Sequence, residues 1–413
     1  MRSNNNILIA QGGGPTSVIN QSLVGIIFEE KKNKSKIFGS RNGVNGIINN
    51  KFINLNDLTN KDLSKIAETP GAALGSTRDK PDEKYCLEIL KVLKKKKIRK
   101  FYYIGGNDSS DSLRIISDNS KKIGYNLQCV HIPKTIDNDL VKNDHTPGFG
   151  SAAKYVAQLF SGVNFDVKSL PGVYLGIVMG RHAGFLTSSS TLLRNSEEDG
   201  PHLVFVPEIP FDFDNFLNGI KKNFDRLGRC IIAISEGIQD KNNKLISQKI
   251  NNKPEYDAHG NIQLSGTSSL GDFLASKIKS KLKIPRVRSD TLGYPQRCFL
   301  GTASEVDQKE AYMIASFAVK HTKSFSASFS VGIKERKKFP KKYKISFQIN
   351  SLKDVGGKTK TLPLEFYDRK NNNVSSLFRN YAIPLIGKKI IKTKSIIWNF
   401  LFLLQPFLLK QSS

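Results

Sequence analysis

Gln128-Cys129-Val130-His131-Ile132 runs directly into Pro133-Lys134-Thr135-Ile136-Asp137-Asn138-Asp139, so a short apolar run typical of a buried strand ends in a loop with two carboxylates and a lysine. A turn or a helix cap explains one aspartate, but hardly two beside a lysine. An aspartate ionised at neutral pH can accept a proton from a sugar hydroxyl, a second can help to hold a metal ion, and a lysine can neutralise phosphate. The loop therefore predicts a site of phosphate chemistry.

The same order of strand, turn and helical pattern recurs along the chain. Short apolar runs, each followed by a glycine or polar turn, occur at Ile7–Ala10, Phe101–Ile104, Tyr174–Val178, Leu203–Val206 and Cys230–Ile234. This alternation predicts an α/β fold with mainly parallel sheets flanked by helices. Ligands of such sheets bind beyond the carboxyl ends of the strands, so we expect the polar clusters that follow these strands to meet on one rim.

Two glycine clusters each allow two interpretations. Gly12-Gly13-Gly14-Pro15-Thr16 is as typical of a tight turn as of a phosphate loop, because it matches neither the Walker pattern nor G-x-G-x-x-G. Gly105-Gly106-Asn107-Asp108-Ser109 adds an acid, which suits either a phosphate whose charge is shared with Mg²⁺ or the N-cap of a helix. The residues alone leave both questions open.

Later loops carry arginines to the same rim. Met179-Gly180-Arg181-His182-Ala183-Gly184 contributes an arginine that binds phosphate or forms a surface ion pair, and we interpret its histidine as structural. Ser235-Glu236-Gly237 either orients ligand hydroxyls or forms a capping pair. Arg288 and Leu292-Gly293-Tyr294-Pro295-Gln296-Arg297 add two arginines and a tyrosine, and the guanidinium fork suits a terminal sugar phosphate.

The composition narrows the class of protein. The chain has 413 residues, 38% of them hydrophobic, which is enough for two domains. The net charge of +28 is spread along the chain without a zinc-finger or RNA-binding signature, so we interpret it as mainly solvated surface and expect no nucleic-acid partner. Four scattered cysteines favour a reducing compartment, and the first apolar run is too short for a signal peptide. We therefore expect a soluble cytoplasmic protein.

The end of the chain, residues 388–413, differs from the rest in being basic and then apolar. Its apolar stretch Ile396–Leu409 is shorter than a bilayer span of roughly 20 residues and is interrupted by polar residues and a proline. A docking helix, a peripheral membrane contact and a poorly ordered end are all compatible with it, and membrane contact is the least favoured.

Taken together, these motifs resemble the phosphofructokinase family. The matching stretches follow the family order from about residue 7 to about residue 320. They are Gly12-Gly13 with Pro15 and Asn20, Gly75–Arg78, Gly105–Ser109, Pro133–Asp139, Gly148-Phe149, Met179–Gly184, Ser235–Gly237 and Leu292–Arg297. The resemblance implies two α/β lobes with the active site in the cleft between them, in a homo-oligomer, a dimer or tetramer, in which one arginine can cross a subunit interface.

The resemblance also implies a division into lobes. A larger lobe with the phosphoryl-donor site would comprise residues 1–148 and roughly 298–345. A smaller lobe with the sugar-phosphate site would comprise roughly 149–297 and 346–387, and the tail would follow from residue 388.

Within the family, the chain is similar to the pyrophosphate-dependent branch. ATP-dependent members have glycines where this chain has Asp108 and Lys134, and they often carry a histidine where it has Tyr294. A carboxylate at position 108 would crowd and repel the α-phosphate of ATP, and a lysine at position 134 can bind the leaving phosphate. The implied reaction is reversible phosphoryl transfer from pyrophosphate to the 1-hydroxyl of fructose 6-phosphate, giving fructose 1,6-bisphosphate and phosphate.

The resemblance assigns roles to particular residues. Asp137 would be the general base, Lys134 and Arg181 would stabilise charge on the phosphates, and Asp108 with Asn107 would serve a Mg²⁺ site that Asp139 can join. The substrates would be held by Gly13 and Arg78 at the pyrophosphate end and by Thr135, Asp139, Met179, Gly180, Glu236, Arg288, Tyr294 and Arg297 around the sugar phosphate.

Two alternatives remain beside this interpretation. One is an ATP-dependent 6-phosphofructokinase. The other is a catalytically weak regulatory homologue, which Asn107 favours because many members have a metal-associated aspartate at that position and an amide oxygen is the weaker Mg²⁺ ligand.

Overall fold

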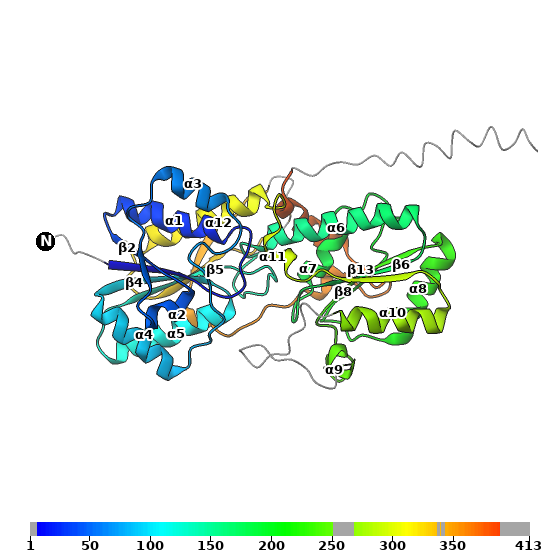
Figure 1. Cartoon of the computed structure of the whole chain (residues 1–413), viewed down its shortest axis with the longest axis horizontal. Helices are drawn as coiled ribbons and strands as arrows, with labels where there is room; N and C mark the ends of the chain where they lie inside the picture. Colours follow the sequence, from blue (N-terminus) through cyan, green and yellow to red (C-terminus); the bar gives the residue numbers. More distant parts are fainter. Residues whose placement is uncertain (1–5, 251–267, 337–338, 340–342, 389–413) are drawn as a thin grey trace, which may run out of the picture.

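Two separate sheets organise the chain, and Figure 1 shows them in two lobes that lie side by side. The structure is a computed structural model, which describes residues 6–250, 268–336, 339 and 343–388. The larger sheet has the strand order β11-β10-β5-β4-β1-β2-β3. Its strands are β1 (Asn6–Gln11), β2 (Lys36–Ser40), β3 (Phe52–Asn54), β4 (Ile98–Gly105), β5 (Gln128–Pro133), β10 (Phe329–Ile333) and β11 (Phe347–Asn350). The five central strands are parallel, and the edge strands β3 and β11 are antiparallel to their neighbours.

Helices cover both faces of this sheet because its central strands carry apolar side chains on both sides. Along β1, Ile7 and Ile9 face one core and Leu8 and Ala10 face the other. The first core is closed by α1 (Ile19–Lys32), α3 (Asn60–Glu68) and α12 (Glu305–His321). The second is closed by α2 (Gly43–Ile48), α4 (Glu83–Lys95), α5 (Asn107–Lys122) and α13 (Leu352–Val355).

The smaller sheet is parallel throughout and has the order β7-β8-β6-β9. Its strands are β6 (Val173–Val178), β7 (Leu203–Phe205), β8 (Cys230–Ser235) and β9 (Val287–Thr291). One face packs on α8 (Phe213–Leu227) and α10 (Ser269–Leu282), and the other packs on α6 (Phe149–Ser169). Helix α6 contacts η3 (Ile383–Ile386) in turn, and α14 (Ser376–Ala382) lies beside η3. Shorter elements complete this half: α7 (Phe185–Ser188), η1 (Ser189–Thr191), α9 (Ile246–Ile250), α11 (Pro295–Cys298), η2 (Leu364–Phe366), β12 (Tyr367–Asp368) and β13 (Asn373–Val374).

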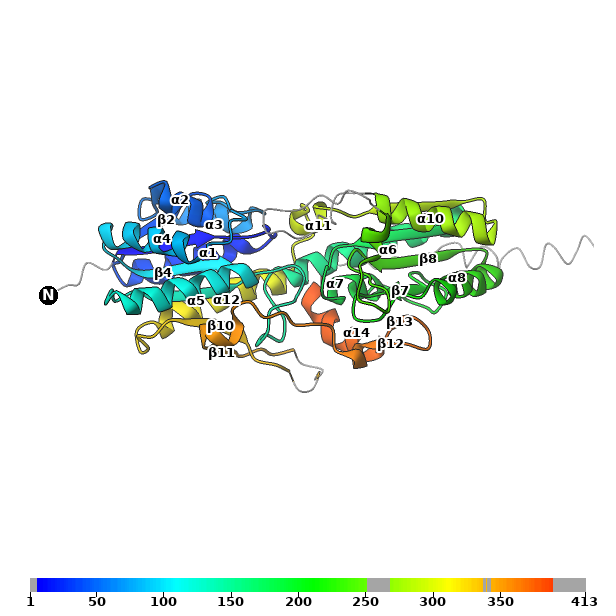
Figure 2. The same ribbon diagram turned by 90° about the horizontal axis from the view of Figure 1, so that it is seen from below.

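The last described part of the chain contributes to both lobes. Strand β11 pairs with β10 in the larger sheet, whereas α14 packs in the same core as α6 in the smaller lobe, beside η2 and η3. Figure 2 shows the orange segment after β11 passing from one lobe to the other. The division expected at residue 346 therefore differs from the sheet topology, because Phe347–Asn350 pairs as an edge strand of the larger sheet.

The predicted fold class is confirmed, and each apolar run quoted above as a strand lies in one, with Val206 just beyond the end of β7. No helix in the described part of the chain is long and apolar enough to cross a membrane. The tail interpretations fall on residues 389–413, which lie outside the described residues.

Candidate active site

A cavity of about 830 Å³ lies where the loops at the carboxyl ends of both sheets meet. The larger sheet contributes the loops after β1, β4 and β5, and the smaller sheet contributes those after β6, β8 and β9. The structure thus brings together residues from six separate strand ends, as the parallel topology requires. Of the predicted site residues, those that line the cavity are Gly13, Arg78, Asn107, Asp108, Lys134, Thr135, Asp137, Asp139, Met179, Arg181, Glu236, Tyr294 and Arg297.

Two predicted residues lie elsewhere. Gly180, with a φ of 136°, shapes the turn behind the cavity wall, and its carbonyl accepts a hydrogen bond of 2.6 Å from the hydroxyl of Ser235. Arg288 is exposed on the edge strand β9, where it pairs with Tyr174 near the start of β6. The cavity lies beyond the opposite end of β6, so Arg288 does not line the cavity of its own chain.

The loop after β5 is fixed against the glycine turns of the neighbouring strands. The backbone N–H of Lys134 donates to the carbonyl of Gly105 at 3.0 Å, and its ammonium group donates to the carbonyl of Gly14 at 2.7 Å. Lys134 is only 3% exposed, so its position is determined by these contacts. The next turn passes through Asn138, which has a left-handed φ of 59°, and places the carboxylates on either side of it at the cavity.

The ionisable groups of this loop have strongly shifted pKa values. Burial, followed by the nearby charges of Arg297 and Arg78, lowers the pKa of Lys134 to about 7. Removal from bulk water raises the pKa of Asp137, against the opposing effects of Arg297 and Lys134. Burial and the negative charge of Asp137 raise the pKa of Asp139 in the same way. Acids and bases whose pKa values move toward neutrality are typical of catalytic sites.

The glycine turn after β1 lies beside the Lys134 ammonium group. Gly13 has a φ of 74° and donates its N–H to the carbonyl of Thr77 at 2.9 Å, which fixes the turn against the loop that carries Arg78. A Cβ atom at Gly14 would lie 3.1 Å from the guanidinium Nε of Arg297. Three cationic side chains therefore lie around the small glycine residues, which leave the main chain accessible to an anion.

The turn after β4 provides oxygen atoms suited to a metal ion. Helix α5 begins at Asn107 with Gly106 before it, so neither Asp108 nor Ser109 is its N-cap. The amide nitrogen of Asn107 donates to Asp139 at 3.2 Å, while its Oδ1 is buried without a hydrogen-bond partner. Asp108 is half-exposed and its carboxylate lies 3.5 Å from the ammonium group of Lys80.

Within the described ranges, no group of three or more His, Cys, Asp or Glu side chains could hold a metal ion on its own. Mg²⁺ commonly takes one or two protein oxygens and completes its shell with substrate phosphates and water. The unpartnered Asn107 oxygen beside Asp139 and Asp108 fits such an arrangement.

The sequence interpretation missed several residues of the cavity. Lys80, Tyr103, His182, Gly357 and Thr359 all line it. Lys80 lies two positions after Arg78 and could have been found from that spacing. His182, interpreted as structural, is exposed to the cavity instead. Gly357 and Thr359 come from a segment in which no motif marked them.

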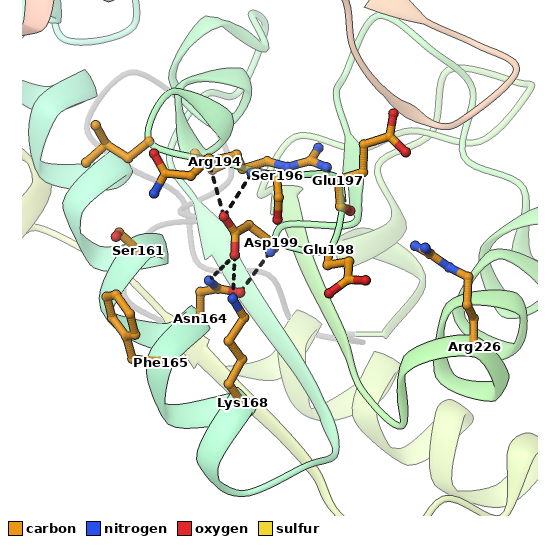
Figure 3. A pocket seen from close by; sticks show the side chains of 14 residues that line it. Ser161, Asn164, Phe165, Lys168, Arg194, Ser196, Glu197, Glu198, Asp199 and Arg226 are labelled. Carbon is orange, nitrogen blue, oxygen red and sulfur yellow. Dashed lines mark hydrogen bonds and ion pairs between the residues drawn. The ribbon is translucent and has the colours of Figure 1, made fainter. Parts of the chain in front are cut away.

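A second cavity, of about 560 Å³, lies in the smaller lobe between α6 and the loop before β7. Figure 3 shows Asp199 at its centre, with its carboxylate surrounded by donors. Asp199 accepts hydrogen bonds from Lys168 at 2.6 Å, from Asn164 at 2.9 Å and from the main-chain N–H groups of Asn195 and Ser196 at 2.9 and 3.1 Å. Lys168 and three neutral donors within the protein thus stabilise the charged form of this acid.

The cleft lies between two sheets of mainly parallel strands, and cations and carboxylates from the strand ends line it. This arrangement is typical of a two-lobed α/β phosphotransferase. The sequence profile of the family described as Phosphofructokinase matches residues 6–322. The chain belongs to the phosphofructokinase family.

Individual relatives agree with this assignment. A pyrophosphate–fructose 6-phosphate 1-phosphotransferase of Rhodospirillum rubrum is 52% identical over 384 residues, which cover 92% of this chain and 94% of that protein. A protein of the same name from Xanthomonas campestris pv. campestris is 34% identical over 394 residues, covering 93% and 92%. The crystal structure of a pyrophosphate-dependent phosphofructokinase from Nitrosospira multiformis matches with a TM-score of 0.83 and 30% identity over 95% of each chain.

Proposed function

We propose that the protein transfers a phosphoryl group reversibly from pyrophosphate to the 1-hydroxyl of fructose 6-phosphate. The observation that carries this proposal is the buried ammonium group of Lys134, which lies 2.7 Å from the carbonyl of Gly14 at the donor end of the cleft. A fixed cation there can bind the phosphate that leaves. The named activity of the relatives with 52% and 34% identity supports the same donor.

The shape of the donor end favours a small donor over a nucleotide. The carboxylate of Asp108 is half-exposed and lines the cavity together with Arg78 and Lys80. A nucleotide would bring its α-phosphate toward this carboxylate, and the contact between like charges costs several kcal/mol. Pyrophosphate has no third phosphate and avoids that contact.

The residues of the loop after β5 would carry the chemistry. Asp137 accepts the proton of the 1-hydroxyl, and the oxygen freed of its proton attacks the transferring phosphorus atom. Lys134 and Arg181 stabilise the negative charge on the transferring and leaving phosphates. Arg297 and Tyr294, which stack with the guanidinium carbon 4.8 Å from the ring centre, hold the sugar phosphate, with Met179, Glu236 and Thr135 along its length.

Mg²⁺ belongs to this proposal, with Asn107, Asp108 and Asp139 as the groups that would hold it. When bound, it would neutralise part of the pyrophosphate charge. Arg288 does not line the cavity of its own chain, so its assignment to the sugar phosphate requires a second copy of the chain, and the proposal includes a homo-oligomer. It also includes a cytoplasmic location.

A donor exchange tests the proposal. Purified protein is supplied with fructose 6-phosphate, Mg²⁺ and either pyrophosphate or ATP, and fructose 1,6-bisphosphate is measured. We expect kcat/KM to be on the order of 100-fold higher with pyrophosphate, as the clash between like charges implies. Turnover that is faster with ATP would show that Lys134 and Asp108 do not select the donor.

A further inference from the structure

Residues Gly357–Leu362, called the strap here, cross from one wall of the cleft to the other. The strap lies outside residues 6–322, the range that matches the family. Figures 1 and 2 show this orange segment between the two lobes. Two of its residues, Gly357 and Thr359, line the cavity itself.

On the first wall, the strap binds the end of the catalytic loop through its main chain. The N–H of Lys360 donates to the carbonyl of Asp139 at 2.7 Å, and Thr359 forms an antiparallel bridge with Leu140. These bonds fix the main chain of Asp139, whose carboxylate lines the cavity two residues after Asp137.

The side chain of Lys360 holds the next turn of the same loop. Its ammonium group donates to the carbonyls of Asn143 at 2.8 Å and Asp144 at 2.9 Å. The same group lies 4.9 Å from the ring centre of Phe185, the first residue of α7 in the core of the smaller lobe. One cation therefore contacts both lobes.

On the second wall, the strap is joined to the loop after β6. The backbone N–H groups of Leu362 and Gly184 donate to the same carboxylate oxygen of Glu208, at 2.7 and 2.9 Å. Gly184 closes the turn that begins at Met179 and carries Arg181. A continuous series of bonds thus connects Asp139 on one wall with the Arg181 turn on the other.

We propose that Lys360 is a positioning residue for phosphoryl transfer, which sets the distance between the catalytic loop after β5 and the Arg181 turn after β6. Reacting groups on opposite walls must meet within a few tenths of an ångström, and a displacement of about 1 Å costs on the order of 100-fold in rate. The proposal rests on the proposed function only because phosphoryl transfer is the reaction whose rate is measured in the test.

The test compares Lys360→Met, Lys360→Arg and the control Lys358→Met, which removes an exposed lysine two positions away on the same segment. Lys360→Met is expected to lower kcat about 10- to 100-fold while each KM changes less than about 3-fold, because substrate groups are kept and their alignment is lost. Lys360→Arg, which keeps the charge and the donors, is expected to regain part of kcat. Lys358→Met is expected to behave as the parent.

Parental kcat in Lys360→Met, an effect on KM alone, or an equal loss in the control would each overturn the proposal. If Lys360→Met does not fold, Lys360→Gln replaces it, and failure of both to fold would make Lys360 a structural residue and also overturn the proposal. Each variant is compared with the parent on the donor that the parent uses. If the parent used only ATP, the proposed function would be contradicted, but the kcat values of the variants and the parent could still be compared with ATP as the donor.

Discussion

Asp137 and Asp199 are both removed from bulk water in the same chain, yet their surroundings shift their pKa values in opposite directions. Burial raises the pKa of Asp137, and the cations near it do not fully compensate. Burial acts on Asp199 too, but the hydrogen bonds from Lys168, Asn195 and Asn164 outweigh it and lower the pKa of Asp199 to about 2. Both acids line a cavity, but the carboxylate of Asp199 accepts four hydrogen bonds from within the protein, and these stabilise its charged form.

The difference separates an acid that stabilises the fold from one that is available for chemistry. A carboxylate whose charged form is more stable in the folded than in the unfolded state stabilises the protein. A carboxylate whose charged form is less stable in the folded state destabilises it. The raised pKa of Asp137 therefore lowers the stability of the folded protein, and such a loss is common in active sites. Substitutions at the two positions should have opposite consequences.

The largest effect is expected for Asp137→Asn. The amide cannot accept the hydroxyl proton, so kcat should fall by about 1,000-fold. The free energy of unfolding should stay the same or rise, because a poorly solvated charge is removed. Turnover measured at saturating substrates, together with urea unfolding, checks both halves. Residual activity close to that of the parent would remove Asp137 from its role as base.

Lys134 gives the next largest effect and adds a dependence on pH. Lys134→Met should lower kcat/KM for pyrophosphate about 100-fold, because a fixed cation at the donor phosphates is lost. With its pKa lowered to about 7, Lys134 carries its charge below that pH and loses it above, so kcat/KM for pyrophosphate should decline as the pH rises through 7.

Lys134→Arg sharpens this test, since a guanidinium group stays charged over the whole range. A parent profile that is flat between pH 6 and 8, or a decline that persists unchanged in Lys134→Arg, would assign the titration to another group.

The smallest effect is expected for Asp199→Asn, and it falls on stability alone. The lowered pKa corresponds to about 2 kcal/mol of folding free energy. Since the folded pKa lies below the ordinary value of 3.8, this contribution is present above that pH and is lost as the pH falls toward 2. Urea unfolding at pH 7 and again at low pH measures it, with kcat expected to be unchanged.

The control for this variant is Asp225→Asn, whose carboxylate forms an exposed ion pair with Lys221 at 2.7 Å. Such pairs contribute at most about 1 kcal/mol. If Asp199→Asn lost activity as strongly as Asp137→Asn, the distinction between the two acids would fail.

Much of the fold could be predicted because its signals are local. The run at Ile7–Ala10 is buried on both faces of a parallel sheet, and that burial is what makes it continuously apolar. Strands β2, β3, β9, β10 and β11 were not predicted. Of these, the edge strands β3 and β11 are short and partly exposed, so their apolar content is weak. Their place in the sheet depends on pairing with distant residues.

The site was predictable where a residue belongs to a motif that follows a strand, as Lys134 and Asp137 do. Thr359 and Lys360 were missed because their proximity to Asp139 arises from the return of the chain across the cleft. Arg288 was assigned to the site through resemblance, but its strand register places it near the start of β6, at the end of the sheet opposite the cavity of its own chain. Sequence shows which residues are suited to chemistry, and only topology shows which of them meet.

The strap also determines when, during synthesis of the chain, the two walls of the cleft become linked. Ribosomes synthesise proteins from the N-terminus, and domains generally fold as their residues emerge. The acids and arginines that line the cavity all come before residue 300, but the bonds from Lys360 and Leu362 that join its two walls come more than fifty residues later. A nascent chain can thus hold every cavity-lining acid and arginine named above and still lack the link between its two halves, so the two walls are joined only after residue 362 has been added.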